Sequence, residues 1–191
     1  MTFNCIIAGV GGQGTVLASK LISAAAMKKG FDVRTTETIG MAQRGGSVFG
    51  HIRIGENIFS PLVPLGKADA IIAFEPSEAV RQLAYLSKEG TVISCNSPVQ
   101  PAGTGGSYEA SVMMNFLEAN APRLIAVDGV KLREQNAKTL NVCLLGTAAQ
   151  SGIFPFDADT LKEILIETLP THYHKMNLKA FELGRALCPQ K

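Results

Sequence analysis

The sequence predicts an α/β fold in which a doubly wound, mostly parallel sheet carries helices on both faces. Three observations lead to this prediction. Short apolar runs that suit strands alternate with segments in which apolar residues recur at helical spacing. The first apolar run, Cys5–Ala8, ends in a glycine-rich turn that opens a helix. A later segment, Val48–Ile54, alternates along its length, which is typical of an antiparallel hairpin strand and makes the expected sheet mixed.

The first unit, from Phe3 to about Thr36, contains a strand, a glycine turn, a helix and a second strand. Gly9, Gly11 and Gly14 match the G-x-G-x-x-G pattern, with a strand before it and a helix after it. Glycine lets the backbone pass close to a ligand, and the N–H groups at a helix start face an anion. The turn is therefore a candidate cradle for a phosphate, although a tight crossing from strand to helix also needs glycines for packing alone. This arrangement is typical of a Rossmann-like sheet.

The second strand of this unit, Phe31–Thr36, lacks one feature of a dinucleotide site. Such sites place an acidic residue at the end of that strand to hold a ribose hydroxyl. Asp32 lies inside the strand and Glu37 lies beyond it, so neither is an evident ribose ligand. We expect the two strands of the unit to be parallel and joined by a right-handed helical crossover.

The segment after this strand, residues 36–47, is a candidate binding loop. It has weak periodicity and lies where doubly wound sheets build their sites. Arg44 can pair bidentately with a phosphate or a carboxylate. Gly45 and Gly46 would allow close approach to a ligand or to another subunit. The alternative is a solvated loop with one surface arginine.

The remaining elements follow in order. We expect residues 48–54 and 58–59 to form a hairpin, with His51 as a half-buried strand residue or an interface contact. Pro76 should open the next helix, so Glu75 either supplies charge at that helix start or meets a ligand hydroxyl. Asn141 needs a partner in its apolar helix, near the hairpin or on another chain. The other expected strands are 68–74, 90–94 and 123–127, and the expected helices are 108–120, 139–150, 158–168 and about 173–187.

Composition limits the function classes. The 191 residues are 46% hydrophobic, which suits one compact domain, and the net charge of +2 gives no electrostatic argument for nucleic acid. The absence of tryptophan makes a base-stacking platform improbable. We see no secretory signal and no apolar run of the ~20 residues that span a bilayer. The sequence therefore predicts a soluble, cytoplasmic protein.

The cysteines and histidines do not suggest a metal site. The four cysteines form no C-x-x-C pair, and buried inert thiols are the better interpretation. His172 and His174 are two residues apart on an expected helix, so their side chains face different ways. No metal ligand and no iron–sulfur cluster is therefore predicted on this chain.

Four segments together resemble one known family. They are the glycine turn 9–14 (GVGGQG), residues 36–38 (TET), residues 43–46 (QRGG) and residues 51–55 (HIRIG). This set is similar to the gamma subunits or domains of 2-oxoacid:ferredoxin oxidoreductases. Ala68–Asp69 and the segment 141–146 look most like the small (beta) subunits of indolepyruvate ferredoxin oxidoreductases. The resemblance covers nearly the whole chain, as a single gamma-type domain over residues 1–191.

The resemblance implies a subunit that is not self-sufficient. Such enzymes oxidatively decarboxylate 2-oxoacids on thiamine diphosphate, pass electrons through iron–sulfur clusters to ferredoxin and transfer the acyl group to coenzyme A. The thiamine and cluster sites are expected on a larger partner subunit, against which this chain would pack. In some relatives the gamma part helps bind coenzyme A. We therefore expect no catalytic residue here, an inactive isolated chain, and contact with ferredoxin only through the partner.

The site residues implied by the resemblance form two groups. A phosphate-facing turn would be made by Gly9, Gly11, Gly12, Gln13 and Gly14. A second wall, facing the larger subunit or the phosphates of the coenzyme, would be made by Gln43, Arg44, Gly45 and Gly46. A contact between two copies of this chain is left open as well.

Two other functions remain in competition. One is a free-standing NAD- or flavin-linked enzyme, whose weak point is the missing ribose carboxylate. The other is a non-catalytic scaffold in which the glycines serve only packing and subunit contact.

Overall fold

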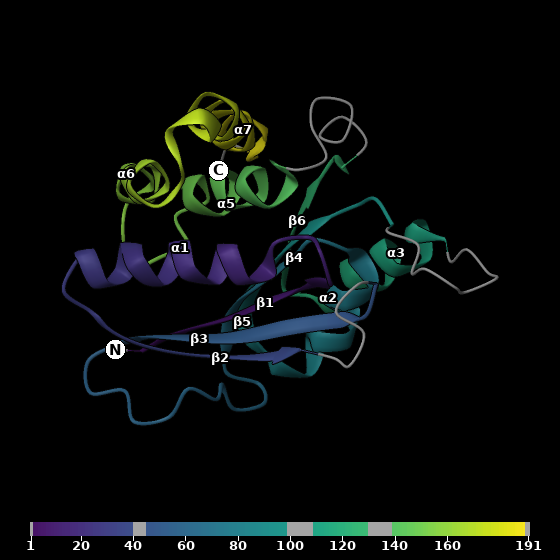
Figure 1. Cartoon of the computed structure of the whole chain (residues 1–191). Helices are drawn as coiled ribbons and strands as arrows, with labels where there is room; N and C mark the ends of the chain where they lie inside the picture. Colours follow the sequence, from purple (N-terminus) through teal and green to yellow (C-terminus); the bar gives the residue numbers. More distant parts are fainter. Residues whose placement is uncertain (1, 40–44, 99–108, 130–138, 190–191) are drawn as a thin grey trace.

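A mixed sheet forms the centre of the molecule (Figure 1). The computed structural model describes residues 2–39, 45–98, 109–129 and 139–189, and within them six strands follow the order β2-β3-β1-β4-β5-β6. β1, β4, β5 and β6 are parallel, while β3 is antiparallel to both of its neighbours. The predicted mixed, mostly parallel sheet is confirmed. The strands are β1 (Phe3–Val10), β2 (Asp32–Ile39), β3 (Ser47–Gly55), β4 (Ala68–Ala73), β5 (Leu86–Cys95) and β6 (Arg123–Val127).

β3 lies between β1 and β2. β1 and β2 are parallel, as predicted for the two strands of the first unit, but each pairs with β3 instead of with the other. The predicted hairpin between residues 48–54 and 58–59 is wrong, because residues 58–59 belong to no strand. The hairpin is formed by β2 and β3, from Asp32 opposite Gly55 to Ile39 opposite Val48. An alternating strand can pair with the segment before it or after it, and the pattern alone does not decide which.

The described helices agree with the sequence pattern at most positions. They are α1 (Thr15–Lys28), α2 (Pro76–Gln82), α3 (Ala110–Asn120), α5 (Leu140–Gln150), α6 (Ala158–Thr168) and α7 (His174–Leu187). The predicted cap of α6 is confirmed, since the Asp157 carboxylate accepts a hydrogen bond of 2.7 Å from the Thr160 N–H. The helix that begins at Pro76 is shorter than expected: it ends at Gln82, passes through a 3-10 turn (Leu83–Tyr85), and Leu86 already belongs to β5.

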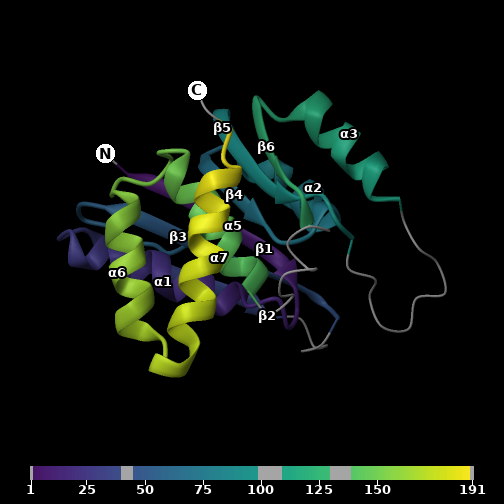
Figure 2. The same cartoon turned by 90° about the horizontal axis from the view of Figure 1, so that it is seen from above.

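Helices cover both faces of the sheet. α1, α5, α6 and α7 lie on one face, in a core with alternate strand residues such as Ile7 and Ile72. α2 and α3 contribute to a second core on the other face, with Ile6 and Ile71. Figure 2 looks down on α6 and α7, which form an outer layer over α1 and α5. Because successive residues of β1 enter opposite cores, this strand is buried on both sides, as its continuous apolar sequence predicts.

α5 is the most deeply buried helix of the described chain. Every residue from Leu140 to Ala149 is buried, because the sheet lies on one side of the helix and α7 on the other. Two glycines let α5 and α7 approach closely. A Cβ on Gly146 would lie 2.1 Å from the Phe181 carbonyl oxygen, and one on Gly184 would lie 1.8 Å from that of Cys143. The Thr147 hydroxyl donates a hydrogen bond of 2.8 Å to the Gly184 carbonyl across this contact.

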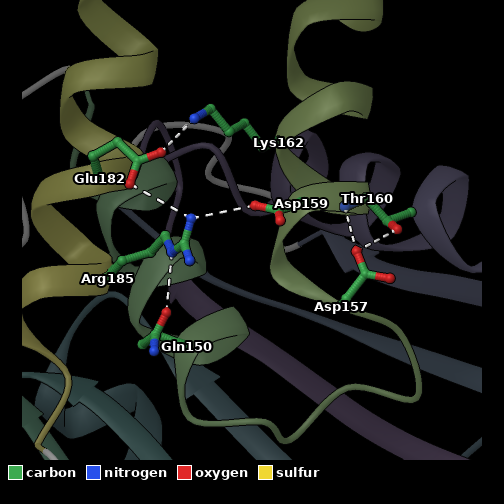
Figure 3. A network of polar contacts seen from close by, with 7 residues as sticks. All are labelled: Gln150, Asp157, Asp159, Thr160, Lys162, Glu182 and Arg185. Atoms are coloured by element: carbon green, nitrogen blue, oxygen red, sulfur yellow. Dashed lines mark hydrogen bonds and ion pairs between the residues drawn. The ribbon is translucent and has the colours of Figure 1, made fainter.

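Charged side chains connect the outer helices (Figure 3). Lys162 of α6 pairs with Glu182 of α7 at 2.6 Å, and Arg185 of α7 lies 3.3 Å from Asp159 of α6. The Arg185 Nε also donates to the Gln150 side chain of α5 at 3.0 Å. Surface ion pairs contribute little individually, and this network links α5, α6 and α7 at the surface.

No helix within the described ranges combines the length and the hydropathy needed to cross a bilayer.

We predict that Gly146→Ala and Gly184→Ala each lower the free energy of unfolding by about 3 kcal/mol, because the added methyl meets rigid backbone atoms. Urea denaturation would measure the loss. Gly152→Ala is the control: its φ of 71° strains an alanine, but nothing lies within 4 Å of the added methyl. That strain costs roughly 1–2 kcal/mol. Equal losses in all three variants would contradict the close packing of α5 on α7.

Candidate functional site

The glycine turn connects the end of β1 to the start of α1. Gly14 occupies the N-cap position of α1 in a left-handed conformation, with φ of 81°, and Gly12 has φ of 101°. The N–H groups in the first turn of an α-helix have no intrahelical partner, and no side chain among the described residues caps them here. An anion at this point would meet free N–H donors and the positive end of the helix dipole.

The side chain of Gln13 braces the turn from inside. Its amide oxygen accepts a hydrogen bond of 2.6 Å from the Val10 N–H, and its amide nitrogen donates to the Phe74 carbonyl oxygen at 3.2 Å. Both ends of the amide are therefore occupied, and they join the carboxyl ends of β1 and β4. A Cβ on Gly9 would lie 2.8 Å from the Gln13 amide oxygen, so this glycine makes room for the brace.

Gly45 and Gly46, from the predicted second wall, lie directly beside the turn. The Gly11 N–H donates to the Gly46 carbonyl at 2.8 Å, and the Gly45 N–H donates to the Gly11 carbonyl at 3.4 Å. These bonds continue the pairing of β1 with β3 beyond Val10. The structure thus brings the two glycine segments together, while Gln43 and Arg44 lie outside the described residues.

Asn141 contacts the turn from the first residues of α5. Its amide nitrogen donates to the Gly14 carbonyl at 3.4 Å, and its amide oxygen accepts from the Val142 N–H at 2.9 Å. We expected the hydrogen-bond partner of Asn141 near the hairpin or on another chain. The structure corrects this expectation: the partner is the glycine turn, 127 residues away in the sequence. A Cβ on Gly14 would lie 2.3 Å from the Asn141 amide nitrogen, so position 14 also needs glycine for space.

β1 and β4 together form a topological switch point. They are parallel neighbours, but the helix after β1 lies on one face of the sheet and the helix after β4 lies on the other. In open α/β sheets, ligands bind outside the carboxyl ends of such strands. The glycine turn and the segment Phe74–Glu75 flank this position, and Gln13 spans it.

Glu75 is a fully buried carboxylate at the same edge of the sheet. It caps α2, since its Oε2 accepts hydrogen bonds from the Glu78 N–H at 3.0 Å and from the Ser77 hydroxyl at 2.5 Å. Its Oε1 is also buried and has no hydrogen-bond partner among the described residues. Burial raises the pKa of the Glu75 carboxyl group, and the two hydrogen bonds oppose the shift only in part. Of the two roles expected for Glu75, the structure shows the one at the start of α2.

Glu78 is a residue that the sequence analysis missed. Its buried carboxylate accepts a hydrogen bond of 2.5 Å from the Ser47 hydroxyl and lies 3.3 Å from the Arg81 guanidinium. Because Ser47 follows Gly46, this contact ties the second glycine segment to α2. The position of Glu78, three residues after Glu75, could have indicated its role, since capping patterns place a carboxylate there.

His51 and three of the cysteines, which the sequence analysis also considered, are buried. His51 is buried on β3, and its Nδ1 accepts a hydrogen bond of 3.2 Å from the Val63 N–H. Cys5, Cys95 and Cys143 are buried, and burial raises the pKa of the Cys143 thiol to about 12, so it is not a thiolate nucleophile at neutral pH. In the described ranges no group of three or more histidine, cysteine or acidic side chains is placed to hold a metal ion.

The sheet order bears on dinucleotide binding. Asp32 and Glu37 belong to β2, which is separated from β1 by β3. Neighbouring strands lie about 4.8 Å apart, so the end of β2 is roughly 10 Å from the end of β1 across the sheet. The pairing of a glycine turn with a carboxylate on the adjacent strand, which NAD sites use, is therefore not built here.

We predict that Gly14→Ala destabilises the chain more than Gly12→Ala. Both substitutions place an alanine at positive φ, at a cost of roughly 1–2 kcal/mol, but only the methyl at position 14 meets the Asn141 amide. Adding Asn141→Ala to Gly14→Ala should recover the difference, because it removes the colliding group. Urea denaturation of the three variants and the wild type would decide, and equal effects of the two glycine substitutions would speak against the Asn141 contact.

A second prediction concerns pH. The folded-state pKa of Glu75 lies above the unfolded value, so its contribution to stability is fully present below the unfolded pKa and is lost as pH rises through the folded pKa. Glu75→Gln removes this titration and keeps an oxygen for the Glu78 N–H. The unfolding free energy of the variant should therefore rise relative to wild type as the pH increases above the unfolded pKa of a glutamate, about 4.3. A difference between Glu75→Gln and wild type that does not change with pH would refute the assignment.

The comparisons with known proteins agree with this arrangement. The family model described as pyruvate ferredoxin/flavodoxin oxidoreductase matches residues 4–187. The chain is 39% identical over 190 residues to the indolepyruvate oxidoreductase subunit IorB of Pyrococcus horikoshii, covering 95% of this chain and 94% of that protein.

Two solved structures share the fold. The gamma subunit of a keto/oxoacid ferredoxin oxidoreductase from Geobacter sulfurreducens matches with a TM-score of 0.69, 18% identity and 97% coverage of both chains. A 2-oxoglutarate:ferredoxin oxidoreductase from Magnetococcus marinus matches with a TM-score of 0.70 and 21% identity, over 97% of this chain and 31% of that one. The chain belongs to the pyruvate ferredoxin/flavodoxin oxidoreductase family, as a small subunit of a 2-oxoacid ferredoxin oxidoreductase.

Proposed function

We propose that this chain, folded as a single gamma-type domain, is the small subunit of an indolepyruvate or other aryl-pyruvate ferredoxin oxidoreductase. The assembled enzyme would oxidatively decarboxylate 2-oxoacids to acyl-coenzyme A. Thiamine diphosphate would stabilise the carbanion formed on decarboxylation, and it would lie with the iron–sulfur clusters on the larger subunit. The observation that carries the proposal is the glycine turn, an uncapped helix start, on a chain whose described residues form no cluster that could hold a metal ion.

The preference for an aryl-pyruvate is supported by one relative. The relative from Pyrococcus horikoshii is an indolepyruvate oxidoreductase subunit, and it matches this chain over nearly its whole length. With the substrate site on the larger subunit, the small subunit would contribute a docking surface and no group that reacts.

Coenzyme A is the ligand that the turn would serve. Its phosphates would meet the free N–H groups at the start of α1, where the helix dipole favours negative charge. Gly9, Gly11, Gly12 and Gly14 would keep the backbone accessible, and Gln43 and Arg44, with Gly45 and Gly46, would form the second wall. Gln13 would act through its brace between Val10 and Phe74, since both ends of its amide are occupied. Coenzyme A is present in the solved Magnetococcus marinus structure.

A second candidate function is a non-catalytic scaffold. Several glycines of the turn have packing roles: Gly9 makes room for Gln13, Gly14 makes room for Asn141, and the Gly11 N–H is paired with Gly46. These contacts favour a turn that serves assembly alone. A free-standing NAD-linked enzyme is disfavoured, because β3 separates the turn from the acidic residues of β2.

Reconstitution with the larger subunit tests the proposal. We expect the purified chain alone to show no oxidation of indolepyruvate, and the mixture with the larger subunit to reduce ferredoxin when indolepyruvate and coenzyme A are present. Calorimetric titration of coenzyme A and of NAD into the chain and into the complex separates the alternatives. Turnover by the isolated chain would favour a free-standing enzyme. An active complex in which Gly14→Ala leaves the KM for coenzyme A unchanged would favour the scaffold, provided the variant folds.

A further inference from the structure

The second face of the sheet is covered by different segments in its two halves. α2 and α3 contribute to the core on that face with residues of β1, β4, β5 and β6, and the connector 56–67 runs along β3 (Figure 1). Figure 1 shows the connector on the side of the sheet away from α1. Arg34 of β2 and Arg53 of β3 lie on this face, because they share it with His51, whose ring packs against Tyr85 at 5.2 Å.

Arg34 and Arg53 are directly opposite each other in the register of β2 and β3. Arg53 donates to the Asn4 side chain at 2.9 Å and to the Ser60 carbonyl at 3.1 Å, and Arg34 donates to the carbonyl of its neighbour Val33 at 3.0 Å. No carboxylate in the described part of the chain forms an ion pair with either guanidinium. Like charges directly opposite on paired strands are destabilising, so this pair would be relieved by carboxylates from outside the chain.

Beside the arginines the connector exposes three large apolar side chains. Phe59 is 93% exposed, Leu62 is 58% exposed and Leu65 is 67% exposed. The connector is nevertheless held in place: Val63 is buried and donates its N–H to His51, and the Gly66 N–H donates to the Ala84 carbonyl at 2.9 Å. An ordered segment that holds apolar groups in water suits a protein interface.

A cavity of about 500 Å³ opens between the connector and the sheet. Arg53 and His51 line it together with Leu62, Leu65 and Tyr85. It therefore combines a positive charge with an apolar wall, and it is large enough for the side chain of a bound protein.

We propose that these residues form a docking surface, the arginine–leucine face, for the larger subunit of the oxidoreductase. The face is defined by Arg34, Arg53, Phe59, Leu62 and Leu65. Its partner surface would present apolar side chains with carboxylates beside them. A second copy of this chain fits less well, because a symmetric contact centred on the face would bring arginines against arginines. This inference rests on the proposed function, which supplies the partner.

The test measures binding of the larger subunit to single variants of the full chain by biolayer interferometry. Arg34→Glu and Phe59→Ser should each weaken the affinity by roughly tenfold or more, as interface anchors do. The matched controls are Lys179→Glu on α7 and Ile166→Ser on α6, both exposed on the opposite side of the sheet, and they should change the affinity by less than about twofold. Thermal unfolding checks that every variant is folded.

Three outcomes would overturn the inference. If Arg34→Glu and Phe59→Ser both bind with wild-type affinity, the arginine–leucine face is not the docking surface, and the proposed function is unaffected. Failure of the wild-type chain to bind the larger subunit at all would remove both. Light scattering that finds a dimer of the isolated chain, converted to monomer by Phe59→Ser, would assign the face to a second copy.

Discussion

The hydrogen bonds of one side-chain amide hold together the edge of the sheet that carries the candidate site. Gln13 accepts from the Val10 N–H and donates to the Phe74 carbonyl, so it joins the ends of the two parallel strands at which the chain switches faces. Next to Gln13, Gly14 takes a left-handed conformation at the start of α1. The pairing of Gly11 with Gly45 and Gly46, and the contact of Ser47 with Glu78, extend the same edge to β3 and α2.

Much of the fold could be predicted from the sequence because its signals are local. The apolar runs of β1 and β4, the helical spacing of α1 and the capping carboxylate at Asp157 each act over a few residues. The position of β3 could not be predicted, since strand alternation specifies which face a residue takes and not which strand becomes its neighbour. The incorrect expectation of a hairpin between residues 48–54 and 58–59 follows from that one missing piece of information.

The candidate site was predictable in part for the same reason. The glycine pattern identified the turn, because the spacing of glycines depends on local backbone geometry. The roles of individual side chains depend on distant contacts: Gln13 bonds to the Phe74 carbonyl, Asn141 contacts the turn from 127 residues away, and Glu78 accepts a hydrogen bond from Ser47. The same contacts also explain why the glycines are needed. At positions 9 and 14 a Cβ would occupy space that these polar side chains already fill.

The burial of α5 has a consequence for how the polypeptide reaches its native state. This helix is covered on its outer side by α7 (His174–Leu187), so part of its apolar surface stays exposed until α7 has left the ribosome. During synthesis the nascent polypeptide therefore exposes apolar surface on α5, and such surface is prone to aggregation until α7 packs against it.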